Sequence, residues 1–201
     1  MKNICSFLSE HKHFYMLLLL LPILVWFKYL EATLVPRYII HMALDDRIPF
    51  VREFVVPYLL WFPYIGYGLV YTGIHSRQEY YRLFVFLAGG MSAAYIAYMF
   101  FLPAATNVCP SVHVINSIAV DAALQHCRDF DTKRYRKPAS HILTILIILS
   151  TVLIKQHSIA DVVWGMIVSV PFYILLYAVP GRKAAGICAG NNRWTLHRIK
   201  E

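Results

Sequence analysis

Two short polar motifs carry the side chains of this sequence that could perform chemistry. The first is a P-S-V-H motif that ends at His113, and in the second His157 is followed four residues later by Asp161. Residues four apart on a helix share a face, so the Asp161 carboxylate can bind one nitrogen of His157 and leave the other free. An imidazole held in this way is a competent nucleophile, and a second imidazole can supply a proton near neutral pH. The motifs therefore indicate nucleophilic and acid–base chemistry, with phosphoryl transfer as the candidate reaction.

The P-S-V-H motif is also suited to hold an anion. Proline is tolerated in the first turn of a helix, and a serine there places its hydroxyl beside backbone amides that have no partner within the helix. A helix that opens at Ser111 would therefore offer a site for a phosphate group. Lys155, two residues before His157, could neutralise a phosphate oxygen, or could equally extend toward lipid head groups.

Asp161 also has a purely structural interpretation. An aspartate at the centre of a membrane helix costs about 2.5–3.5 kcal/mol, and less near the interface, so it needs a partner or a function. We favour a function for Asp161, because a second histidine motif is expected at the same membrane face. The alternative is that the bond between His157 and Asp161 only joins two helices.

The composition places both motifs in a membrane protein. Of the 201 residues, 59% are hydrophobic and 15% are charged, which is too apolar for a soluble domain. A helix needs about 20 mostly apolar residues to cross the hydrocarbon. The sequence therefore predicts one all-α membrane domain over residues 1–201, a bundle of six transmembrane helices at about 14–30, 54–74, 83–102, 111–127, 139–154 and 158–179.

Two stretches depart from the simple pattern of apolar helices. The fourth segment is the least apolar, because it contains Asn116, Ser117 and Asp121, and we expect its neighbours to shield it from lipid. A position in the membrane interface is the alternative for this segment. The long connection at about 31–53 mixes charged and apolar residues, so we expect either a short amphipathic helix at the head groups or a solvated connector.

The lysines and arginines predict the orientation of the chain, because short cytoplasmic connections carry their excess. With six spans, fourteen of the 19 lie on the side of both termini, and five lie on the other side. Both termini are therefore predicted to be cytoplasmic in a multi-pass protein of the cell membrane. The net charge of +8 then follows from topology and suits anionic lipid head groups, without nucleic acid as a partner. His113 and His157 both fall on the extracytoplasmic face.

At this point the chain resembles the type 2 phosphatidic acid phosphatase superfamily of membrane enzymes. The P-S-x-H pattern of that family matches the motif at His113, and its later S-x-x-x-x-x-x-H-x-x-x-D pattern matches Ser150, His157 and Asp161. The resemblance implies that His157 forms a phosphohistidine, that Asp161 orients it and that His113 protonates the leaving oxygen. It also implies a metal-independent phosphatase, without a cofactor, that hydrolyses a lipid phosphomonoester or pyrophosphate.

Three departures from the family pattern concern how phosphate is held. The first family motif, K-x-x-x-x-x-x-R-P, has no clear counterpart, Thr151 stands where an arginine is usual, and Val112 stands where glycine is usual. Lys155, Arg47 and Arg52 are the outer-face cations that could take over phosphate binding. The K-Q-H sequence looks more like the branch with sphingolipid head-group transferases, so transfer of the phosphoryl group to an alcohol remains an alternative to hydrolysis.

Other classes of protein fit the sequence less well. A serine hydrolase built on Ser111 would lack the G-x-S-x-G elbow, and a CDP-alcohol phosphotransferase would need a multi-aspartate signature that is absent from the sequence. A transporter or scaffold is a non-enzymatic alternative, because His113, Asn116, Ser117 and Asp121 have the spacing of one helical face. The transporter interpretation predicts the larger loss on substitution of Asp121, and the phosphatase interpretation predicts it at the two histidines.

Overall fold

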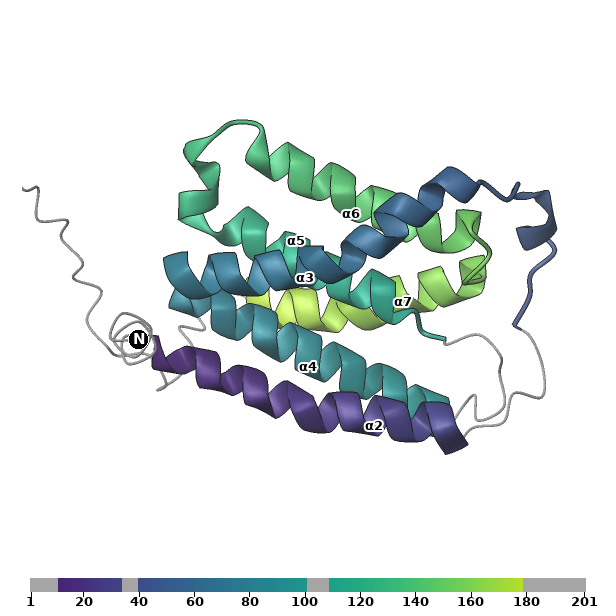
Figure 1. Cartoon of the computed structure of the whole chain (residues 1–201), viewed down its shortest axis with the longest axis horizontal. Helices are drawn as coiled ribbons and strands as arrows, with labels where there is room; N and C mark the ends of the chain where they lie inside the picture. The colour runs from purple at the N-terminus through teal and green to yellow at the C-terminus, as the bar shows by residue number, and fades with distance from the viewer. Residues whose placement is uncertain (1–10, 34–39, 101–108, 179–201) are drawn as a thin grey trace, which may run out of the picture.

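The computed structural model describes residues 11–33, 40–100 and 109–178, and every regular element in these ranges is helical. Long helices run back and forth along one axis and form a bundle (Figure 1). They are η1 (Lys12–Leu19) continued by α2 (Leu20–Thr33), α3 (Val55–His75), α4 (Arg77–Phe100), α5 (Val112–His126), α6 (Arg136–Leu153), and α7 (Ile159–Tyr173) continued by η5 (Ile174–Ala178). Short turns of 3₁₀ helix form η2 (Asp45–Arg47), η3 (Arg52–Phe54) and η4 (Arg128–Thr132).

Each of the six predicted segments contains one of these long helices, and the boundaries differ by a few residues. Residues 101, 102 and 179 of the predicted spans lie outside the described residues. Among the described residues, five helices are long and apolar enough to cross a membrane: Lys12–Thr33, Arg52–His75, Arg77–Phe100, Arg136–Leu153 and Ile159–Ala178. Large apolar side chains such as Leu24, Leu59, Leu149 and Ile167 are exposed on these helices, as expected for contact with lipid. The described part of the chain is therefore all-helical, and its five apolar helices are compatible with a multi-pass membrane protein.

The remaining long helix, α5, is shorter and lies at the centre of the bundle. It has 15 residues, which gives a length of about 22 Å against a hydrocarbon thickness of about 30 Å. Ten of its residues are buried, among them Asn116, Ser117 and Asp121, and it packs against α3, α4, α6 and α7. The expected shielding of this polar segment by its neighbours is confirmed.

A glycine on a neighbouring helix allows the close approach that buries α5. A Cβ atom added at Gly90 of α4 would lie 2.5 Å from Cγ2 of Ile115, a separation that packed atoms do not adopt. The absence of a side chain at this position therefore lets the two helices pack tightly, and α5 shares its most extensive contacts with α4.

Candidate active site

The two predicted motifs meet at one end of the bundle, where α5 and α7 begin. This is the end drawn at the right of Figure 1, where α3 also begins and α6 ends. The backbone N–H of Ser111 donates to the carbonyl oxygen of Asp161 at 3.0 Å, so the starts of the two helices are joined directly. A Cβ atom at Gly165 would lie 3.0 Å from the Ser111 carbonyl oxygen, so glycine permits this approach. The hydroxyl of Tyr98 donates to the Pro110 carbonyl at 2.6 Å and fixes the entry to α5.

His157 and Asp161 form the contact that their spacing predicts. The Nδ1 atom of His157 lies 3.2 Å from Oδ2 of Asp161, and both side chains are buried. The same carboxylate oxygen accepts the backbone N–H of Ser158 at 3.0 Å. Because a carboxylate accepts hydrogen bonds, this arrangement favours the tautomer with the proton on Nδ1 and a lone pair on Nε2. The geometry is that of an oriented nucleophile.

His113 lies against His157 and between two aromatic rings. The centroids of the two imidazoles are 5.5 Å apart, with the rings inclined at 64°. Tyr58 stacks on His113 with centroids 4.7 Å apart, and Trp61 contacts it at 4.3 Å; both come from the start of α3. These ring contacts fix the orientation of the His113 imidazole beside His157. No pattern in the sequence distinguishes Tyr58 and Trp61 from the other aromatic residues expected at membrane interfaces.

The first turns of α5 and α7 differ in whether their amides are already bonded. In α7 the Ser158 hydroxyl accepts the N–H of Ala160 at 3.2 Å, and Asp45 accepts the N–H of Ile159 at 2.9 Å. In α5 the N-cap Ser111 makes no side-chain cap bond, and among the described residues its buried hydroxyl has no partner. The start of α5 is therefore the more available of the two for a phosphate oxygen.

Asp45 is the main site residue that sequence reasoning missed. Its carboxylate accepts the hydroxyl of Ser158 at 2.6 Å as well as the N–H of Ile159, and it accepts the N–H of Met42 at 2.8 Å. Burial alone would raise the pKa of Asp45, but the hydrogen bonds from Ile159, Ser158 and Met42 outweigh burial and hold this pKa below its usual value. Asp45 thereby fastens the connection between α2 and α3 to the start of α7.

Residues 40–53 of this connection are mostly exposed, and hydrogen bonds to α6 and α7 hold them at a few points. Residues 34–39 lie outside the described residues, and the rest forms no continuous amphipathic helix but contains the two short turns η2 and η3. The N–H of Val51 donates to the Leu153 carbonyl at 3.0 Å, so the segment is bonded to the end of α6 as well as to α7. We name residues 40–51 the docked loop. Its contacts join residues more than 100 positions apart, which no local pattern in the sequence indicates.

Lys155 supports the docked loop from the turn between α6 and α7. Its ammonium group donates to the carbonyl oxygens of Asp45 at 2.6 Å and Ile48 at 2.5 Å. Its φ angle of 59° is left-handed, and the bonds from Lys155 N to Val152 O and from Gln156 N to Thr151 O, both 3.0 Å, form a Schellman end to α6. An ammonium has three donors, so one remains for the predicted contact with phosphate.

The other candidates for phosphate binding and for reaction lie as follows. Arg47 in the docked loop and Arg52, directly after it, are both exposed, and Nε of Arg52 donates to Glu53 at 3.0 Å. The Ser150 hydroxyl donates to the Ile147 carbonyl of its own helix at 2.6 Å, which gives this residue a structural contact within α6.

Cys109 precedes the P-S-V-H motif and is a further potential nucleophile. Burial, and to a smaller extent the nearby charge of Asp161, raises the pKa of its thiol to about 12. Cys109 is therefore a neutral thiol and a poor nucleophile.

The geometry at this end of the bundle can support transfer of a phosphoryl group to an imidazole. It combines a carboxylate-held His157, a second imidazole at its edge, and an uncapped helix start beside both. Comparisons of the chain with known protein families, with curated proteins and with solved structures give no match, so the case for its chemistry rests on its own residues.

Proposed function

We propose that the protein is a membrane phosphatase that hydrolyses a lipid phosphomonoester or pyrophosphate through a phosphohistidine at His157. One observation carries this proposal: His113 contacts the ring of His157, whose Nδ1 is held by the buried Asp161. The arrangement agrees with the roles implied by the resemblance to type 2 phosphatidic acid phosphatases. We further propose that α5 is the sixth span, that both termini are cytoplasmic, and that this site faces the outside of the cell membrane.

The first step transfers the phosphoryl group to the enzyme. Nε2 of His157 attacks the phosphorus atom, and the bond from phosphorus to the oxygen of the lipid breaks. A protonated His113 donates its proton to the departing oxygen, so the lipid leaves as a neutral alcohol. For a pyrophosphate substrate the leaving group is the lipid monophosphate. Asp161 stabilises the positive charge that develops on His157 during the attack.

The second step releases the phosphate. His113, now neutral, accepts a proton from a water molecule as the water oxygen attacks phosphorus. The bond between phosphorus and Nε2 of His157 breaks, which releases inorganic phosphate and restores the free histidine. The backbone amides at the start of α5 and the hydroxyl of Ser111 are placed to bind the phosphate oxygens in both steps, and the third donor of Lys155 can add a positive charge.

The test is phosphate release by the detergent-purified protein in EDTA from a panel of lipid phosphates: phosphatidic acid, phosphatidylglycerol phosphate, an isoprenyl pyrophosphate and a sphingoid phosphate. We expect release by the wild type, loss in His157→Ala and His113→Ala, and retention in His75→Ala, which removes an exposed histidine from the opposite end of α3. Acid-labile label from a ³²P-labelled substrate should be trapped on the wild type but not on His157→Ala.

Two outcomes would contradict hydrolysis. Equal background release by the wild type and all variants would contradict the proposal that the protein is a phosphatase. Release that depends on an added alcohol, with the phosphoryl group recovered on that alcohol, would instead identify a head-group transferase that uses the same histidine.

A further inference from the structure

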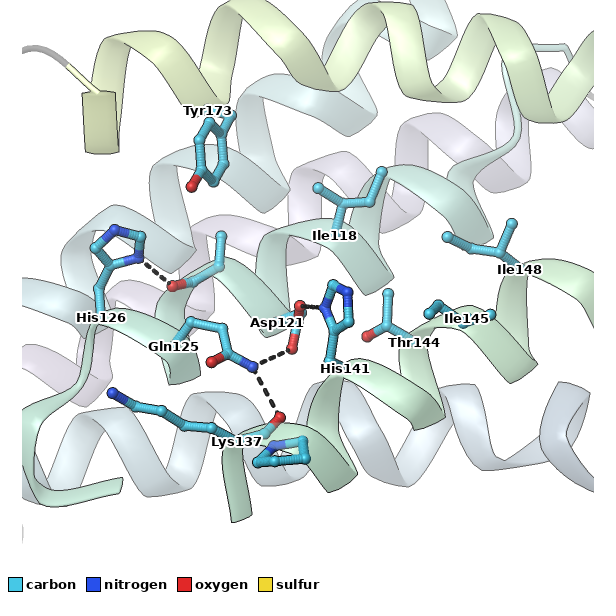
Figure 2. A pocket seen from close by; sticks show the side chains of 12 residues that line it. Ile118, Asp121, Gln125, His126, Lys137, His141, Thr144, Ile145, Ile148 and Tyr173 are labelled. Carbon is cyan, nitrogen blue, oxygen red and sulfur yellow. Dashed lines mark hydrogen bonds and ion pairs between the residues drawn. The ribbon is translucent and has the colours of Figure 1, made fainter. Parts of the chain in front are cut away.

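A second polar constellation lies at the opposite end of α5 from His113. It lines a cleft of about 660 Å³ between α5, α6 and α7, a size typical of sites for small organic ligands (Figure 2). The polar lining residues come from the last turns of α5 and the first turns of α6, whereas the proposed catalytic residues stand at the start of α5 and of α7. The cleft is therefore a separate site, and the reasoning about it does not depend on the proposed function.

Asp121 organises the polar part of this cleft. Its carboxylate accepts hydrogen bonds from Nδ1 of His141 at 2.8 Å and from Nε2 of Gln125 at 3.0 Å (Figure 2). It also accepts a hydrogen bond from the Ser140 hydroxyl at 2.7 Å. Tyr64 extends the network, because its hydroxyl lies 2.7 Å from the Ser140 hydroxyl. Protein donors thus satisfy the oxygens of Asp121, the one acid among the described residues that line the cleft, although its negative charge remains.

The groups that remain available in this part of the cleft are hydrogen-bond donors or can become so. His141 is bonded to Asp121 through Nδ1, which directs its Nε2 away from the carboxylate, and its side chain is 64% exposed. His126 is likewise held through Nδ1, by the carbonyl of Ala122 at 2.8 Å. Lys137 is paired with Asp131 at 3.3 Å, but Asp131 is 67% exposed, so water screens this pair and a ligand anion can share the ammonium. Lys137 is therefore the cation that an anion can reach in this part of the cleft, and protonation of His141 would turn its Nε2 into a second donor.

The opposite part of the cleft is apolar. Ile118 on α5 and Ile145 and Ile148 on α6 line it. In Figure 2, Ile145 and Ile148 lie on one side of His141, and Gln125, His126 and Lys137 lie on the other. Ile145 is 46% exposed, so the cleft is open along the outer surface of the bundle. A cleft that is polar near the helix ends and apolar toward the middle of the bundle matches the polarity of one leaflet of a bilayer.

From this polarity we propose that the cleft binds one anionic phospholipid. Its phosphate lies at Lys137 and Nε2 of His141, and one acyl chain lies along Ile118, Ile145 and Ile148. A soluble anion would leave the apolar part of the cleft in contact with water or unfilled, whereas a phospholipid satisfies both parts at once. The lipid is taken from the leaflet opposite to the one that His157 faces, so this site is not an extension of the proposed catalytic site.

Native mass spectrometry of the full-length protein tests this proposal. The delipidated protein is given equal amounts of phosphatidylglycerol and phosphatidylcholine with identical chains, and the ratio of the two lipids retained on singly lipidated protein is measured. We expect phosphatidylglycerol to be preferred by the wild type and equally by His157→Ala. Lys137→Gln should lower the ratio about fivefold, because one cation near the membrane surface has about this effect on anionic lipid binding.

Two further variants separate the cleft from general contact with lipid. Lys133→Gln removes a cation from the same end of the bundle but outside the cleft lining, and it should change the ratio less than twofold. Ala122→Leu fills the cleft and should lower retention of both lipids, with a thermal unfolding scan to verify that this variant is folded. The proposal would be overturned if the wild type retained the two lipids equally. It would also be overturned if Lys137→Gln and Lys133→Gln gave equal ratios, because the preference for phosphatidylglycerol would then come from the overall charge at this end of the bundle.

Discussion

Two histidine–aspartate pairs lie near opposite ends of α5, and their surroundings differ. His157 and Asp161 are one turn apart on the same stretch of chain, both are buried, and a second imidazole lies at the edge of the ring. His141 and Asp121 come from two helices, the histidine is largely exposed, and the carboxylate is shared with Ser140 and Gln125. The distance is shorter in the second pair, 2.8 Å against 3.2 Å. A close pair is therefore not sufficient to identify a catalytic histidine; the groups around it decide.

The largest effect should separate the two histidines. His157→Ala should reduce phosphate release by about 10³-fold or more, because it removes the atom that attacks phosphorus. His141→Ala should leave the rate within about twofold, because this histidine lies at the other end of the bundle. Steady-state rates of both variants with the same lipid phosphate provide the comparison. A loss in His141→Ala as large as that in His157→Ala, in a protein that unfolds at the wild-type temperature, would contradict the distinction between the two ends.

Substitution of Asp161 should lower activity, whereas substitution of Asp121 should lower stability. Asp161→Asn should lower kcat by about 10² to 10⁴-fold with a small change in stability, because an amide supports the wrong tautomer of His157. Asp121→Asn should leave kcat near the wild-type value but lower the free energy of unfolding by about 1–3 kcal/mol, because its single oxygen cannot keep both the bonds made to Oδ1 by Ser140 and Gln125 and the bond made to Oδ2 by His141. Kinetics and thermal unfolding of both variants measure this. The transporter alternative predicts the reverse order of functional loss.

A third difference between the two ends of the bundle is the docked loop, which Asp45 binds to Ser158 and Ile159 next to His157. The pKa of Asp45 is held below its usual value, so its stabilising contribution is full above the ordinary aspartate pKa of about 3.9 and is lost as pH falls through the lower value of the folded protein. Asp45→Asn should reduce the free energy of unfolding by about 1–2 kcal/mol at neutral pH, and the gap to wild type should close in acid.

The neighbouring Asp46 supplies a matched control for Asp45. It pairs with His41 at 3.0 Å, and its side chain is 73% exposed. Asp46→Asn should therefore change stability by less than about 0.5 kcal/mol at neutral pH. Unfolding temperatures of wild type and both variants between pH 7 and pH 3 test this; a gap for Asp45→Asn that stays constant across the whole range would contradict a role for the ionised carboxylate.

The smallest effect concerns Lys155, where the backbone and the side chain make separate contributions. Lys155→Ala and Lys155→Gly both remove the bonds to the docked loop, but only glycine also relieves the left-handed backbone. The glycine variant should therefore be more stable than the alanine variant by about 1 kcal/mol, while both lose the same amount of activity. Denaturation and kinetics of the two variants measure the two contributions independently. An alanine variant as stable as the glycine variant would contradict the strain at this position.

The sequence predicts those parts of the fold and the site that depend on short segments. Apolar runs locate the helices, and the spacing of His157 and Asp161 predicts their contact, because neighbours on one helix turn are set by its pitch. The bond of Asp45 to the start of α7 and the pairing of His141 with Asp121 are not predictable in this way, because each depends on how separate helices pack. Lysine at the left-handed end of α6 was equally unexpected, since glycine is the usual residue there.

The short central helix α5 also bears on how the protein is made. A segment of 15 residues that includes Asn116, Ser117 and Asp121 is too polar and too short to partition into hydrocarbon on its own during synthesis. Its principal polar partners, Ser140 and His141, belong to α6, and another neighbour is α7, both of which leave the ribosome after it. We therefore expect insertion of α5 to be coupled to α6 and α7, so that the packing around α5 is complete only after both helices have been synthesised.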